Sequence, residues 1–233
     1  MTIDDWFDRE IPLNIGCVLT RGGIYDFNYV KILSQGVRRH LTRRHCFICL
    51  TDADPLHRDW FRAHRINYRP LYHGWSGAWS KIELFRPGFL TGRILYLDLA
   101  TIVTDSLDAL ADYRGRFAML GDPREPGRFV SSLMMWEAGD LEFIYDGFAA
   151  DPFSATDALP DDRAWIDIIC RSKGIVPDRV QNLAPGLCMD IIPILGGAPL
   201  RAKPPGAGLV SFRGRPRPHE LTELSEFVRE NWV

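Results

Sequence analysis

One aspartate, Asp98, interrupts an apolar segment (residues 94–103) that is otherwise typical of a buried β-strand. A carboxylate is costly to bury unless it is paired, bound to a metal ion or placed at the end of a strand. Side chains at positions i and i+2 of an extended segment point to the same side, so Asp98 and residue 100 should face the same way. Two aspartates there would clamp a divalent metal, but residue 100 is Ala100. The pattern predicts a functional carboxylate that lacks this second ligand.

Positive charge for binding a phosphate group is available in two places. Arg213, Arg215 and Arg217 are separated only by glycine and proline. A guanidinium binds phosphate through a two-pronged hydrogen bond and keeps its charge. Lys81 lies on a predicted helix before the Asp98 strand and would add another cation. A solvated turn explains the arginines equally well, and a solvated helix position explains Lys81.

The end of the first predicted strand carries a second group of candidate residues. Thr20 ends this strand, and the flexible Gly22 and Gly23 follow, which would let a ligand approach the backbone. Tyr25 would stack on a nucleobase or belong to the core. Asp52 follows the second predicted strand and would bind a ribose or a base edge, or cap the next helix.

The elements that must position these residues alternate along the chain. The expected elements of the first half are strand 15–20, helix 27–41, strand 47–51, helix 79–85 and the strand that Asp98 ends. This order predicts an α/β fold with a mixed, mostly parallel central sheet flanked by helices. Ligands of such sheets sit at the carboxyl ends of the strands. We therefore expect Asp98 and the loop after Thr20 to face one cleft.

The second half is expected to complete a single domain over residues 1–233. Further strands are predicted at 117–120, 129–136 and 209–212, with helices at 141–148 and 161–170 and a loop from 193 to 208. The division that we expect is a nucleotide-binding part at about 12–110, an acceptor and late-loop part at about 111–218, and a C-terminal helix at 219–233.

The composition is that of an ordinary globular protein. The 233 residues are 46% hydrophobic and 25% charged, and the formal net charge of −2 gives no reason to expect nucleic-acid binding. No apolar stretch is long enough for a transmembrane segment. The N-terminus lacks the features of a signal peptide, and the five cysteines are an odd number, which suits a reducing compartment. We therefore expect a cytoplasmic protein.

Several segments, in order, resemble nucleotide-sugar-dependent glycosyltransferases of the glycogenin and bacterial galactosyltransferase type, which are family 8-like and have the GT-A fold. Residues 93–101 and 106–110 resemble the family's "vlYLDaDt…dl..L" segment. Residues 129–136 resemble its "FNSGvm" strand, and residues 210–218 resemble its late "H..G..KPW" segment. Residues 161–165 fall where the family has its "GDQ" helix start.

The resemblance implies roles for individual residues. Asp98 would bind Mn²⁺ or Mg²⁺, and Ser131 would lie in the donor site. The loop after Thr20 would receive the nucleotide. Asp162 would lie near the transferred sugar as a catalytic residue, although an acidic residue is also common at the start of a helix.

This chain departs from the family pattern at positions that concern the chemistry. Ala100 replaces the second aspartate, and Ser211 and Arg213 stand where an imidazole is expected. Val130 replaces the asparagine of the "FNSG" strand, and Arg163 replaces the glutamine of "GDQ". We therefore expect Mn²⁺ to bind weakly, with the arginines supplying much of the positive charge.

Three functions remain open at this point. The first is a glycosyltransferase that moves a sugar from a nucleotide-sugar, most plausibly a UDP-sugar, to a hydroxyl of an acceptor glycan, lipid or small molecule. The second is a catalytically impaired pseudo-glycosyltransferase that acts as a nucleotide-sugar-binding or scaffold protein. The third is a nucleotidyltransferase, against which the short glycine loop argues because it lacks an embedded lysine.

Overall fold

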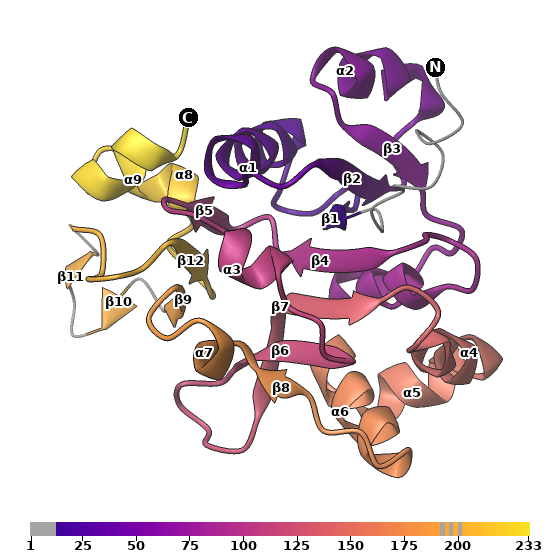
Figure 1. The fold of residues 1–233 in the computed structure, drawn as a ribbon. Coiled ribbons are helices and arrows are strands. Elements are labelled where there is room, and N and C mark those ends of the chain that lie inside the picture. The colour runs from indigo at the N-terminus through magenta and orange to yellow at the C-terminus, as the bar shows by residue number, and fades with distance from the viewer. Residues whose placement is uncertain (1–12, 192–193, 196–197, 200–201) are drawn as a thin grey trace, which may run out of the picture.

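A seven-stranded mixed sheet forms the centre of the computed structural model, which describes residues 13–191, 194–195, 198–199 and 202–233 (Figure 1). The strands lie in the order β3 (Asn67–Pro70), β2 (His45–Thr51), β1 (Leu13–Leu19), β4 (Arg93–Leu97), β7 (Phe129–Glu137), β6 (Phe117–Gly121) and β8 (Asp178–Arg179). β7 runs antiparallel to β4 and β6, and the other neighbouring pairs are parallel. The expected fold class is confirmed.

Helices cover both faces of this sheet (Figure 1). They are α1 (Phe27–His40), α2 (Arg58–Ala63), α3 (Asp108–Ala111), α4 (Glu142–Ala150), α5 (Pro152–Ala158), α6 (Asp162–Ser172) and α7 (Val180–Leu183), with the 3₁₀ helices η2 (Pro55–His57) and η3 (Gly77–Phe85). The alternation of β4 explains the two layers. Leu95 and Leu97 pack in the core that contains α1, whereas Ile94 and Tyr96 pack in the core that contains η3, α4 and α6.

A second, three-stranded sheet brings the late part of the chain to Asp98. β5 (Thr101–Val103) pairs antiparallel with β12 (Leu209–Phe212), which pairs parallel with β9 (Cys188–Ile191). The chain therefore leaves the central sheet after Leu97 and enters another sheet three residues after Asp98. This change of sheet places the arginine-rich segment after β12 beside the end of β4.

Two expectations for the late chain are corrected. The segment 193–208 is not all loop, because β10 (Ile194–Leu195) and β11 (Ala198–Pro199) pair with each other. The C-terminal helix is two helices, α8 (Pro218–Leu221) and α9 (Glu226–Asn231). The Ser225 side chain accepts a hydrogen bond from the Val228 backbone N–H at 3.3 Å and so begins a new helix. Within the described ranges, every helix is too short or too polar to span a bilayer.

Candidate active site

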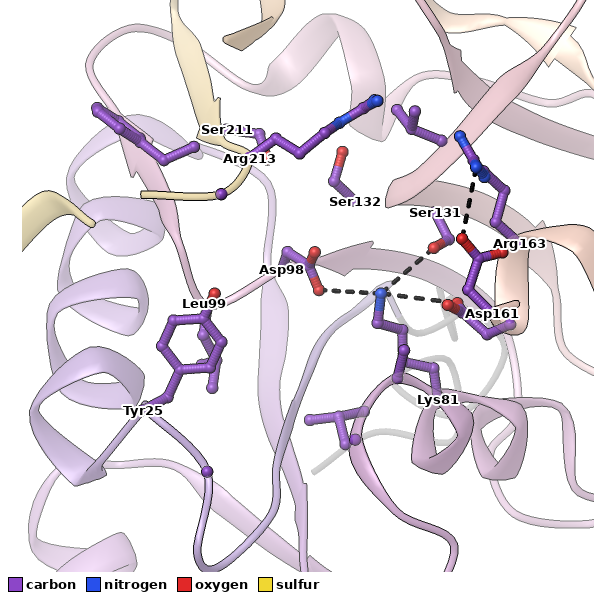
Figure 2. A pocket seen from close by; sticks show the side chains of 18 of the residues that line it. Tyr25, Lys81, Asp98, Leu99, Ser131, Ser132, Asp161, Arg163, Ser211 and Arg213 are labelled. Carbon is purple, nitrogen blue, oxygen red and sulfur yellow. Dashed lines mark hydrogen bonds and ion pairs between the residues drawn. The ribbon is translucent and has the colours of Figure 1, made fainter. Parts of the chain in front are cut away.

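A pocket of about 700 Å³ lies at the carboxyl ends of β1 and β4 (Figure 2). Thr20 and Gly23 line it from the loop after β1, and Asp98 lines it from the turn after β4. This agrees with the expectation that both segments face one cleft. Other predicted site residues among the lining residues are Tyr25, Lys81, Ser131, Asp162 and Arg213.

Three predicted site residues are not among the described residues that line the pocket. Asp52 accepts a hydrogen bond from the Arg21 backbone N–H at 2.7 Å, so it helps to hold the loop after β1 in place. Gly22 has φ of +74°, which glycine adopts without strain, and it lets this loop turn. The Arg215 side chain is 71% exposed and its guanidinium lies 2.7 Å from Glu220. The fold therefore separates Arg215 from Arg213 and Arg217, which both line the pocket.

Asp98 is held by its neighbours on both its backbone and its side chain. Its backbone N–H donates to the carbonyl of Ser132 at 2.9 Å. The hydroxyl of Tyr96, two residues earlier on the same side of the chain, donates to the carboxylate oxygen Oδ1. The side chain is 34% exposed, so the carboxylate is anchored yet reaches the pocket.

Lys81 joins the polar groups of the pocket into one network (Figure 2). Its Nζ lies 3.4 Å from Asp98 Oδ1, 3.6 Å from Asp162 Oδ2 and 3.3 Å from Ser131 Oγ. Burial alone would lower the pKa of Lys81, but the two carboxylates outweigh it and hold this pKa above its ordinary value. The ammonium is therefore a fixed cation at the centre of the site.

Asp162 is the most buried acid of this network. Its side chain is 3% exposed at the start of α6, and Asp161 caps that helix by accepting from the Ala164 N–H at 2.9 Å. Burial raises the pKa of Asp162, which Lys81 and a hydrogen bond from Ser131 only partly oppose. The fold thus places Asp162 against the same cation as Asp98.

A second charged cluster, centred on Asp122, was not predicted from the sequence. The buried Asp122 carboxylate lies 3.0 Å from Arg213 Nη1 and 3.4 Å from Arg163 Nη1, and Arg124 Nε lies 3.8 Å away. Although burial opposes it, the backbone N–H of Arg124 and the Arg213 guanidinium lower the pKa of Asp122. These three arginines all line the pocket, together with the acids Asp161 and Glu125. The only signal in the sequence is an acid two residues after the predicted strand 117–120.

Tyr25 and Arg217 form the wall beside α1. The Arg217 guanidinium carbon lies 5.3 Å from the centre of the Tyr25 ring, and both residues line the pocket. Burial and the charge of Asp98 raise the pKa of Tyr25 to about 12, so its hydroxyl stays protonated at neutral pH.

The expectation that residue 100 shares a face with Asp98 is wrong. The chain is not extended there: residues 99 and 100 form a turn. Ala100 is 2% exposed and packs in the core that contains α1. The i, i+2 rule does not apply across this turn, so a carboxylate at position 100 would enter the core in this conformation.

No protein-family model matches this chain, and no curated protein sequence matches it. The apo form of the glycosyltransferase GlyE from Streptococcus pneumoniae TIGR4 superimposes with a TM-score of 0.66 at 13% identity. That match covers 96% of this chain but 59% of GlyE, and a second GlyE structure is covered over 43% of its length. The galactosyltransferase LgtC, in complex with donor and acceptor sugar analogs, gives a TM-score of 0.52 at 11% identity, covering 88% of each chain. The chain therefore has the fold of GT-A glycosyltransferases, as the sequence resemblance predicted.

GT-A glycosyltransferases typically use a divalent metal, and the residues of this pocket do not fit one. Among the described residues, no group of three or more His, Cys, Asp or Glu side chains could hold a metal ion. Asp98 is the acid expected to bind it, and its Oδ1 is already contacted by Lys81 and Tyr96. An ammonium stands beside the carboxylate from which a metal would need a ligand.

Proposed function

We propose that this protein is a glycosyltransferase that moves a sugar from a nucleotide-sugar, a UDP-sugar in our proposal, to an acceptor hydroxyl. The observation that carries the proposal is the Lys81 ammonium set between Asp98 and Asp162, in a pocket at the carboxyl ends of the strands of a GT-A fold. The acceptor hydroxyl would belong to a glycan, a lipid or a small molecule.

The walls of the pocket offer different chemistry to the parts of such a donor. Tyr25 and the loop after Thr20 would receive the nucleoside, because an aromatic ring and a flexible backbone lie there together. Arg213 and Arg163 would face the diphosphate, which guanidinium groups bind well. Asp162, which contacts Lys81 from the start of α6, would lie near the transferred sugar.

The leaving diphosphate gains negative charge during transfer, and fixed cations stabilise that charge. Lys81 and Arg213 are such cations, and both are anchored by carboxylates. In our proposal these side chains supply charge that Mn²⁺ or Mg²⁺ typically supplies in GT-A glycosyltransferases. We therefore assign no step to a metal ion.

A catalytically impaired protein that binds the donor is the second candidate. The observation that favours it is the pairing of both pocket carboxylates with one lysine, which partly neutralises acids that would otherwise act on the substrate. The comparisons do not favour a nucleotidyltransferase.

A two-stage experiment tests the proposal. A panel of UDP-, GDP- and dTDP-sugars is screened by thermal shift in EDTA and in Mn²⁺; a ligand at 100 Kd should stabilise the fold by about 2.7 kcal/mol. Stabilisation in both conditions, reduced in Arg213→Ala but not in Arg229→Ala, is expected. Release of nucleotide in the presence of an acceptor then separates the enzyme from the binding protein. Absence of stabilisation by every donor would contradict the proposal.

A further inference from the structure

A second pocket, of about 820 Å³, lies beside α2, β3 and the amino-terminal half of β2. No described residue lines both this pocket and the candidate active site. β3 is the edge strand of the central sheet, and Figure 1 shows α2 and β3 together at that edge. The pocket borders the start of β2, whereas the active site lies beyond the strand ends. The strand between them is about 20 Å long.

The second pocket is unusual in its charge. Its basic residues come from α1, β2, α2, β3 and the turn between α2 and β3: Arg38, His45, Arg58, Arg62, Arg65 and Arg69. None of the described residues that line it is Asp or Glu. Because the whole chain has a formal net charge of −2, this is a local concentration of positive charge and not a general property.

Most of this charge has no acidic partner within the described residues. Arg62 lies 2.9 Å from Asp59, but both side chains are more than 80% exposed, and such pairs contribute little. Arg58 lies over the Tyr68 ring at 5.4 Å, which leaves its charge uncompensated. Burial and the nearby charge of Arg65 lower the pKa of Arg38, so these cations repel one another.

The backbone also places an arginine here at a conformational cost. Arg65 has φ of +56°, a left-handed conformation that residues with a side chain rarely adopt. Arg38 holds this turn by donating to the carbonyl oxygens of His64 and Arg65, the latter at 3.0 Å. Glycine would adopt this conformation with less strain, so the turn itself does not require an arginine.

We propose that this arginine pocket is a second ligand site, which binds a phosphate-bearing group with two or more negative charges. Guanidinium groups bind phosphate in a fork geometry and remain charged at all relevant pH values. Several arginines line this one pocket, and none of its described lining residues is acidic, which suits a ligand with more than one negative charge. The group can be a free phosphorylated molecule or the headgroup of an anionic lipid, which carry the same chemistry. The proposal is independent of the reaction assigned to the first pocket.

The first arm of the test is titration calorimetry with inorganic pyrophosphate in metal-free buffer, with Arg213→Ala present in every protein because the first pocket is itself proposed to bind a diphosphate. Arg65→Gly and the double variant Arg58→Gln/Arg69→Gln should each weaken binding about tenfold or more, as expected for the loss of a charged hydrogen bond. The double variant Lys173→Gln/Arg229→Gln removes the same charge from exposed sites elsewhere and should bind as the Arg213→Ala protein does. Arg65→Gly should also melt at an equal or higher temperature, which separates lost binding from lost folding.

The second arm distinguishes the two sources of phosphate. The protein is sedimented with vesicles of phosphatidylcholine alone or with phosphatidic acid added. Sedimentation that requires phosphatidic acid and is lost in Arg58→Gln/Arg69→Gln identifies a lipid headgroup; pyrophosphate binding without sedimentation identifies a soluble ligand. The proposal is overturned if neither probe binds, or if the arginine-pocket variants and the Lys173/Arg229 control lose the same affinity.

Discussion

Lys81 is the residue on which the polar network of the active site depends. Lys81→Met should lower the free energy of unfolding by about 3 kcal/mol, because it leaves the buried Asp162 without its cation. The part contributed by Asp98 is smaller, since a third of that side chain is exposed to solvent. Urea unfolding measures the loss, and nucleotide-sugar affinity should fall in parallel.

The matched controls separate charge pairing from packing. Lys173→Met, at an exposed position, should change stability by less than about 0.5 kcal/mol. Adding Asp162→Asn to Lys81→Met should restore much of the lost stability, because the second change removes the unpaired charge. A double variant as unstable as the sum of its single changes would show that the ion pair does not hold this site together.

Asp122 predicts a dependence of stability on pH. Its pKa is lowered in the folded protein, so its stabilising effect is present above the ordinary value of about 3.9 and is lost as pH falls through and below it. Asp122→Asn should cost about 2 kcal/mol at pH 7, and the difference from the unmodified protein should shrink below about pH 4. Urea unfolding at pH 7, 5 and 3.5 measures this, with Asp140→Asn as the exposed control. A difference that stays constant across this range would contradict the assignment.

At the scale of elements, the N-terminus of α6 combines a structural and a binding role. Asp161 caps the helix and its Oδ2 also lies 3.4 Å from Arg163, which lines the pocket. Asp151 caps α5 in the same way, accepting from the Ser154 N–H at 3.1 Å, but lies outside the pocket. Alanine at either position should cost about 1 kcal/mol of stability.

The two caps should differ in their effect on donor binding. Asp161→Ala removes one of the two carboxylates that hold Arg163, the other being Asp122, and should weaken nucleotide-sugar affinity several-fold. Asp151→Ala should leave this affinity unchanged. Thermal melting and donor titration of the two variants provide the comparison. Equal donor affinity in both would mean that the contact between Asp161 and Arg163 takes no part in binding.

The sequence predicts elements well where a local pattern defines them. The continuous apolar run of β4 and the stripe of Val30, Leu33 and Val37 on α1 are local signals, and the sequence predicts both elements within a few residues. The turn after Asp98 has no such signal, because residues 99–103 are as apolar as a continuing strand. Its cause is long-range: the Phe212 N–H donates to the Ala100 carbonyl at 2.8 Å, which draws the chain into the second sheet.

The same distinction applies to the site residues. Asp98 and Lys81 were recognised as charged groups near an apolar strand, yet their partnership with Asp162 joins positions 81 residues apart in the chain. Asp122 and Arg213 are 91 residues apart, and no local pattern connects them. The sequence therefore indicates which residues are candidates for the site, and only the fold shows which of them form ion pairs with one another.

At the scale of the whole molecule, two pockets lie on one sheet and should respond to different ligands. The active site joins the loop after β1, the turn after β4 and the segment after β12, which are separated by most of the chain. The arginine pocket is built largely from residues 38–70. A ligand stabilises the segments that it contacts, and opening of those segments then becomes rarer.

Hydrogen exchange followed by mass spectrometry should show which segments each ligand stabilises. A bound nucleotide-sugar should slow exchange together in residues 20–25, 98–100 and 211–217, because one ligand would contact all three segments. Inorganic pyrophosphate should slow exchange mainly in residues 58–69, and Arg65→Gly should remove that protection while leaving the donor's effect in place. Protection of residues 58–69 by the nucleotide-sugar that persists in Arg58→Gln/Arg69→Gln would show that the pockets are coupled through β1 and β2, since that variant removes direct binding in the arginine pocket. Protection confined to 20–25, with none at 211–217, would instead mean that the arginine segment after β12 stays out of the donor site.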